Sequence, residues 1–118
     1  MLVRLYSAAV NGLDVKTVEV EVNISKGAKY SIVGLPDSAV RESYFRTRTA
    51  ILNSGFQQST GHIIVNLAPA DLRKEGSGYD LPIAVGVLAA EGAVDKQRLD
   101  KFVLVGELGL DGSLRPVR

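Results

Sequence analysis

The chain has 118 residues, 46% of them hydrophobic and 23% charged, a balance typical of one folded domain and not of a disordered segment. Its formal net charge of +1 excludes a strongly basic footprint over the whole chain, although a local basic patch remains compatible with it. The lack of cysteine excludes disulfides, zinc–thiolate sites and cysteine catalysis, and no apolar stretch approaches the roughly 18 residues of a membrane span.

Three strands are predicted in the first 35 residues. Residues 2–10 read as a strand, and residues 15–24 alternate between an apolar and a polar face. The apolar face of the second run carries Val18, Val20, Val22 and Ile24. The Asn11-Gly12 pair between the two runs is a strong turn signal, so we expect a hairpin. A third strand is predicted at 30–35.

The next stretch predicts a helix from about 37 to 54. Pro36 suits a helix start, and the Asp37 carboxylate complements the positive end of the helix. Apolar and aromatic residues then recur at helical spacing, and Gly55 fits a left-handed C-cap. A short apolar strand over 61–69 follows.

The second predicted helix is nearly apolar on all sides and is therefore expected to be central and buried. Pro82 is tolerated only in the first turn, so this helix should begin near Tyr79 or Asp80. A surface link at 95–101, a strand at 102–108, a turn and a partner strand at 113–117 complete the chain. This order predicts an α+β sandwich with two helices packed on one face of a mixed sheet.

The glycine-rich loop "KEGSGYD", residues 74–80, has two interpretations. Ser77 could be a nucleophile presented on a tight turn, but such a serine needs a histidine or lysine as base. The single histidine, His62, begins a predicted strand, where nothing pairs it with Ser77. In the structural interpretation Gly76 and Gly78 let the chain turn, and Asp80 serves unpaired N–H groups at the helix start. We expect this second role, with no side chain beside the hydroxyl able to take its proton.

Basic residues suggest a surface for nucleic acid or a partner. Arg41, Arg46 and Arg48 lie on the first predicted helix, with Arg73 and Lys74 in the glycine loop as further members. The alternative is a solvated helix face with Glu42 as counter-charge, and no aromatic platform is apparent beside the arginines. One histidine and no acidic cluster argue against a metal site, and no Walker A or G-x-G-x-x-G pattern occurs.

Three segments resemble one bacterial family. "YSIVGLPDSAVRESYFRTRTAI", "IIVNLAPADLRKEGSGYDLPIAVGVLAA" and "LVGELGLDGSLRPV" resemble the signatures of the ComM/YifB family of magnesium-chelatase-like AAA+ ATPases. The resemblance implies that residues 1–118 form a single N-terminal domain, a fragment of a longer cytoplasmic protein whose AAA+ module follows and binds ATP and Mg²⁺. It further implies a ring of protomers, with DNA as a partner and branch migration during natural transformation (competence) as the role.

The same resemblance implies a fold similar to the proteolytic domain of Lon, the ribosomal-protein-five domain-2-like sandwich. Aligned on the acidic-Gly pair of Lon, Glu75-Gly76 places Gly78 at the nucleophile, whereas a slip of one residue places Ser77 there. The lysine partner would fall after Arg118. We therefore expect a non-catalytic domain, a pseudoprotease; an ATP-dependent Ser–Lys protease and a magnesium-chelatase subunit are the alternatives.

Overall fold

A four-stranded mixed sheet forms one layer of the computed structural model, which describes residues 1–11, 13–57 and 61–117. Strand β1 (Leu2–Asn11) pairs antiparallel with β2 (Asp14–Ser25), and β2 pairs antiparallel with β4 (His62–Ala68). Strand β3 (Tyr30–Val33) runs parallel to β4, which gives the order β1-β2-β4-β3. The predicted hairpin is thus confirmed in its pairing, while Gly12 of the turn lies outside the described residues.

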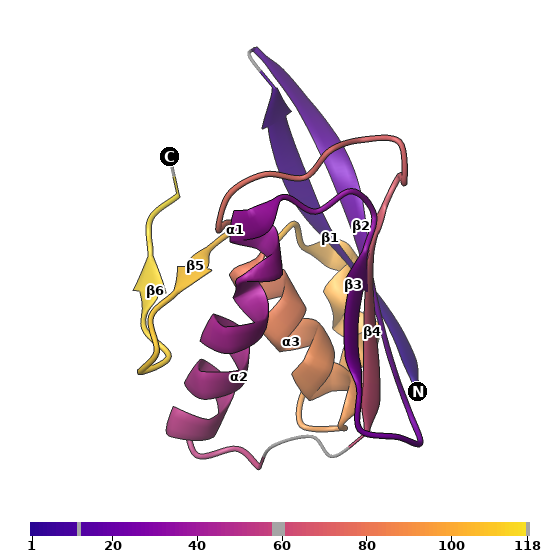
Figure 1. Ribbon diagram of the computed structural model, residues 1–118, viewed down its shortest axis with the longest axis vertical. Coiled ribbons are helices and arrows are strands. Elements are labelled where there is room, and N and C mark those ends of the chain that lie inside the picture. The colour runs from indigo at the N-terminus through magenta and orange to yellow at the C-terminus, as the bar shows by residue number, and fades with distance from the viewer. Residues whose placement is uncertain (12, 58–60, 118) are drawn as a thin grey trace.

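Helices cover one face of this sheet (Figure 1). These are α1 (Ser38–Arg41), α2 (Ser43–Asn53) and α3 (Asp80–Ala90), and a 3₁₀ helix, η1 (Lys96–Lys101), packs near β1. A separate two-stranded ribbon joins β5 (Glu107–Leu108) to β6 (Leu114–Arg115). The α+β class with helices on a mixed sheet is confirmed.

The core lies between the sheet and α3, with α2 flanking it. Alternation puts Val18, Val20 and Val22 of β2 on the inner face, all fully buried, as predicted. Ile83 and Val87 of α3 pack into the same cluster. On the outer face Arg4 pairs with Glu19 and Glu21, so that face is polar. The apolar core therefore lies on one face of the sheet.

Two element boundaries differ from the prediction. The helix expected over 37–54 is divided at Glu42, and beside this break the Ala39 carbonyl accepts a hydrogen bond from Arg46 Nη2 at 2.8 Å. In an unbroken helix that carbonyl would accept from the backbone N–H four residues later. The strand expected at 102–108 pairs in a ladder only at 107–108, since residues 102–106 cross from the edge of β1 to the start of α3.

Candidate functional site

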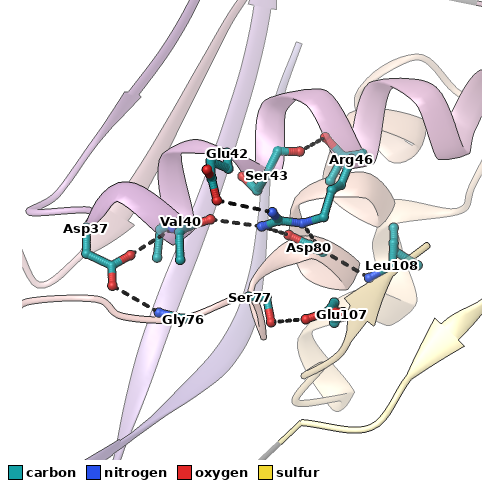
Figure 2. A network of polar contacts seen from close by, with 12 residues as sticks. Asp37, Val40, Glu42, Ser43, Arg46, Gly76, Ser77, Asp80, Glu107 and Leu108 are labelled. Atoms are coloured by element: carbon teal, nitrogen blue, oxygen red, sulfur yellow. Dashed lines mark hydrogen bonds and ion pairs between the residues drawn. The ribbon is translucent and has the colours of Figure 1, made fainter. Parts of the chain in front are cut away.

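A polar network, drawn in Figure 2, joins the loop between β4 and α3 to the start of α1 and to β5, and joins α2 to α3. Asp37 caps α1, because its Oδ1 accepts a hydrogen bond from Val40 N at 2.8 Å. Its Oδ2 accepts from Gly76 N at 3.2 Å, which ties the glycine loop to the start of the helix. Gly76 has φ of +84°, so the left-handed turn inferred from the sequence is confirmed at this residue.

Gly78 is needed for a different reason than the one predicted. Its φ does not lie in the left-handed region. A Cβ atom there would lie 3.2 Å from methyl carbons of both Val105 and Val117. Close packing against the C-terminal segment, and not turning freedom, therefore favours glycine.

Asp80 is fully buried at the start of α3 and forms a bidentate ion pair with Arg46. Arg46 Nε donates to its Oδ2 at 2.7 Å and Arg46 Nη2 donates to its Oδ1 at 3.0 Å (Figure 2). Leu108 N also donates to Oδ2, at 3.1 Å. The expectation that Asp80 serves N–H groups of its own helix is wrong, since its carboxylate instead joins α2 and β5 to α3. Pro82, in the first turn of α3, confirms the predicted helix start.

Arg46 therefore does not belong to the basic surface that the sequence suggested. Its guanidinium is directed inward, and the hydrogen bonds to Asp80 raise its pKa above the usual value. The arginine side chain keeps 22% of its surface exposed, whereas the partner carboxylate has none. Removing either partner would leave a charge in the interior, which is strongly destabilising.

Lys74 is the largest correction to the predicted surface, because it is fully buried. Its Nζ donates to the carbonyl of Gly34 at 2.7 Å and to that of Pro69. The backbone of Lys74 also pairs with Leu35 and Asp37, at 3.0 Å each. Burial lowers the pKa of the ammonium below its usual value. Lys74 thus fastens the loop after β4 to the loop after β3, and its charge is not available to an external partner.

Ser77 donates its hydroxyl hydrogen bond to Glu107 Oε1 (Figure 2). Glu107 Oε2 lies 3.7 Å from Arg115 Nη1, so this carboxylate is also ion-paired. The expectation that no proton acceptor lies beside the hydroxyl is wrong, because Glu107 occupies that place. The observed partner is a carboxylate, whereas the Ser–Lys mechanism that Lon suggests requires an amine.

Three exposed side chains follow one another on the outer face of α1 and α2: Arg41, Phe45 and Arg48. Phe45 and Arg48 are three residues apart in α2, as one helix face requires, and Arg41 is the exposed last residue of α1. Phe45 is 66% exposed, and its ring meets that of Tyr44 edge-on with centroids 5.0 Å apart. The Arg48 guanidinium carbon lies 5.4 Å from the centre of the Tyr44 ring. The sequence interpretation missed these aromatics, although Tyr44 and Phe45 stand between the arginines.

Arg73 remains on the surface, as predicted. It pairs with Glu75 at 3.5 Å, and both side chains are well exposed. The neighbouring Lys74 bridges to Pro36, whose carbonyl accepts from Arg41 Nε at 3.4 Å. The loop carrying Arg73 therefore adjoins the start of the Arg41–Phe45–Arg48 face. Among the described residues, no three histidine or acidic side chains converge as a metal site would need.

Comparison with known proteins identifies relatives along nearly the whole chain. The family model for subunit ChlI of Mg-chelatase matches residues 20–118. The chain is 47% identical over 114 residues to the uncharacterized protein YifB of Escherichia coli and 46% identical to the competence protein ComM of Haemophilus influenzae. Each match covers 96% of this chain and 22% of the relative. An uncharacterized protein of Mycobacterium tuberculosis is 44% identical over 116 residues, which are 23% of its length.

The chain thus spans about a fifth of the length of the curated relatives it matches. No helix in the described ranges is long and apolar enough to cross a membrane.

Proposed function

Because the chain belongs to the family of Mg-chelatase subunit ChlI and is similar to ComM and YifB, we propose that it is the non-catalytic N-terminal domain of a ComM-like AAA+ ATPase that acts on DNA. In this role the domain supplies rigid surfaces for DNA or for neighbouring protomers. The observation that carries the proposal is the outer face of α1 and α2, where Arg41, Phe45 and Arg48 are exposed together.

The chemistry of this face suits a nucleic-acid strand. Guanidinium groups at both ends can contact phosphates, and the exposed ring of Phe45 between them can stack on a base. Arg73 on the adjoining loop extends the positive charge. Since the net charge of the chain is only +1, attraction for DNA must come from such a local group of residues.

The polar network behind this face supports a structural role for the glycine loop. Ser77 is hydrogen-bonded to Glu107, and the Lys74 ammonium is held by backbone carbonyls. The loop has no Walker A pattern, so ATP and Mg²⁺ are assigned to the AAA+ module of the full-length protein and not to these residues. A ring of like protomers in the cytoplasm completes the proposal.

Charge reversal on the helix face tests the proposal. In the full-length protein, Arg41→Glu combined with Arg48→Glu should weaken binding to labelled single-stranded DNA, measured by fluorescence anisotropy over a series of salt concentrations. Loss of two phosphate contacts should reduce the salt slope of log K by about 1.4. Circular dichroism of each variant checks that the fold is kept.

A matched control is available on η1, which packs at the far edge of the sheet against β1. Arg98→Glu with Lys101→Glu makes the same change in net charge at two exposed positions and should leave the salt slope unchanged. Equal effects of both pairs would indicate a general charge effect. Unchanged binding with the helix pair would show that this face does not engage DNA.

Proteolysis is the second candidate, favoured by the position of Ser77 on a glycine turn ahead of a buried helix. It predicts covalent labelling of Ser77 by a fluorophosphonate probe in the full-length protein. We expect no labelling, because the hydroxyl is engaged by a carboxylate. A third candidate is a magnesium-chelatase subunit, because the matching family model describes subunit ChlI of Mg-chelatase. ATP-dependent insertion of Mg²⁺ into a porphyrin by the full-length protein would demonstrate this function.

A further inference from the structure

Residues 102–106 add a short strand-like edge to the sheet outside β1. Val103 forms a parallel bridge with Tyr6, and Leu104 N donates to the Tyr6 carbonyl at 2.9 Å. Further along, Gly106 N donates to the Gly78 carbonyl at 2.9 Å. The N–H groups of alternate residues therefore face the folded core of the protein. We call residues 102–106 the open edge.

The other side of the open edge has no backbone partner in the part of the chain that the structure describes. In an extended chain, neighbouring N–H groups point in opposite directions, so those of Val103 and Val105 face away from β1. Neither group donates a hydrogen bond to any residue that the structure describes. A strand whose backbone groups are hydrogen-bonded on one side and unpaired on the other is an edge strand. Such a strand can pair with a further strand.

The side chains of the open edge are apolar, as in a strand that is buried inside a sheet. Val103 is 60% exposed, and Phe102 and Val105 are exposed beside it. The sequence "FVLV" is apolar on both faces, a pattern typical of strands covered on both sides of a sheet. Exposed Val117 extends the apolar surface, because it and Val105 both lie over Gly78. A surface of this kind is expected to be covered in the complete protein.

We propose that the open edge pairs with a strand from the same polypeptide, from the part that follows residue 118 in the full-length protein. The match covers only the N-terminal fifth of the relatives, so a long region lies beyond the corresponding residues in them. The β5–β6 ribbon brings the end of the described chain back beside the open edge, since Glu107 pairs with Arg115 and Val117 lies near Val105. A strand that follows shortly in the same chain has a higher effective concentration here than a second protein.

This inference concerns how the domain is completed and does not depend on the proposed action on DNA. Residue-resolved hydrogen exchange of the full-length protein tests it. The amides of Val103 and Val105 should exchange about a hundredfold more slowly than that of Leu13 at the exposed hairpin tip, at every protein concentration. Exchange as fast as that of Leu13 would overturn the inference, and protection that increases with protein concentration would assign the edge to a second copy of the chain instead.

A pair of variants provides an independent check. Val105→Lys should accelerate limited proteolysis of the full-length protein after residue 101 by about tenfold, because a lysine would obstruct docking of the added strand. Val15→Lys, also at an exposed strand position but near the hairpin tip, should leave the rate unchanged. Equal rates for the two variants would contradict the proposal.

Discussion

Lys74 illustrates how a charged residue can serve as an internal tie. Its ammonium reaches the carbonyls of Gly34 and Pro69, which belong to the loops after β3 and β4. The Pro69 carbonyl also accepts from Leu72 N, at 3.3 Å. The charge is desolvated, which lowers the pKa of the lysine, but the hydrogen bonds offset much of that cost.

We predict that Lys74→Met destabilises the protein by about 1–3 kcal/mol, because methionine fills a similar space but donates a hydrogen bond to neither carbonyl. Urea denaturation followed by circular dichroism measures the free energy of unfolding. Lys96→Met, at an exposed position on η1, is the control and should change it by less than about 0.5 kcal/mol. A variant at Lys74 as stable as the control would show that the buried hydrogen bonds contribute little.

The buried hydroxyl of Tyr79 should make the protein less stable at alkaline pH. Burial raises the pKa of its hydroxyl to about 12, whereas the unfolded chain has the ordinary value near 10. Above about pH 10 the unfolded state releases the Tyr79 proton while the folded state keeps it. The contribution of the protonated hydroxyl to the free energy of unfolding is therefore complete below about pH 10 and is lost as the pH rises toward 12. Tyr79→Phe should therefore lose less stability than the parent between about pH 9 and 11 in urea titrations. Parallel losses in the two proteins would contradict the assignment.

At the scale of elements, α3 approaches the sheet so closely that Gly86 is required. A Cβ atom there would lie 2.6 Å from Val22 Cγ2 and 3.0 Å from Leu5 Cδ2. The helix is also apolar all round, because the sheet, α2 and the start of β5 surround it. Its contacts thus set the distance between the two layers.

Gly86→Ala should lower the free energy of unfolding by about 1–3 kcal/mol, since the added methyl overpacks the interface with β1 and β2. In an ordinary helix interior the same change stabilises by about 1 kcal/mol, so the sign of the effect distinguishes the two cases. Thermal denaturation measured by calorimetry provides the comparison. A rise in melting temperature would mean that α3 can move away from the sheet at little cost.

Periodicity predicted most of the elements because their patterns are local. The alternation of β2, the start of α3 at Asp80 and the left-handed Gly55 all follow from near neighbours in the sequence. The break at Glu42 does not, because the Ala39 carbonyl beside it accepts from the Arg46 side chain, a contact that helical periodicity does not encode. For the same reason the short extent of β5 was not predictable from an apolar run.

The site was harder to predict than the fold, because burial of a charge depends on distant partners. Arg46 and Lys74 read as surface cations in the sequence, but Asp80 lies 34 residues from the first and Gly34 lies 40 residues from the second. Glu107 was overlooked beside Ser77, although it belongs to the "GELGLDG" motif that carries the family resemblance. Arg41, Arg48 and Arg73 are exposed, as expected, and their role as a binding surface stays a prediction.

At the scale of the whole molecule, these features separate a rigid interior from two outward surfaces. The network around Asp80 locks helices, loop and ribbon together, whereas the Arg41–Phe45–Arg48 face and the open edge are left for partners. On our account the first surface meets DNA and the second is completed by the protein's own chain. The glycine loop is then a structural part of the interior and not a reaction centre.

The most direct test of this account is the rate of ATP hydrolysis by the full-length protein with and without single-stranded DNA. The account predicts that Ser77→Ala keeps the stimulation by DNA, while Arg41→Glu with Arg48→Glu lowers it by about tenfold without changing the basal rate. Loss of stimulation in the Ser77 variant, or full stimulation in the arginine variant, would contradict it.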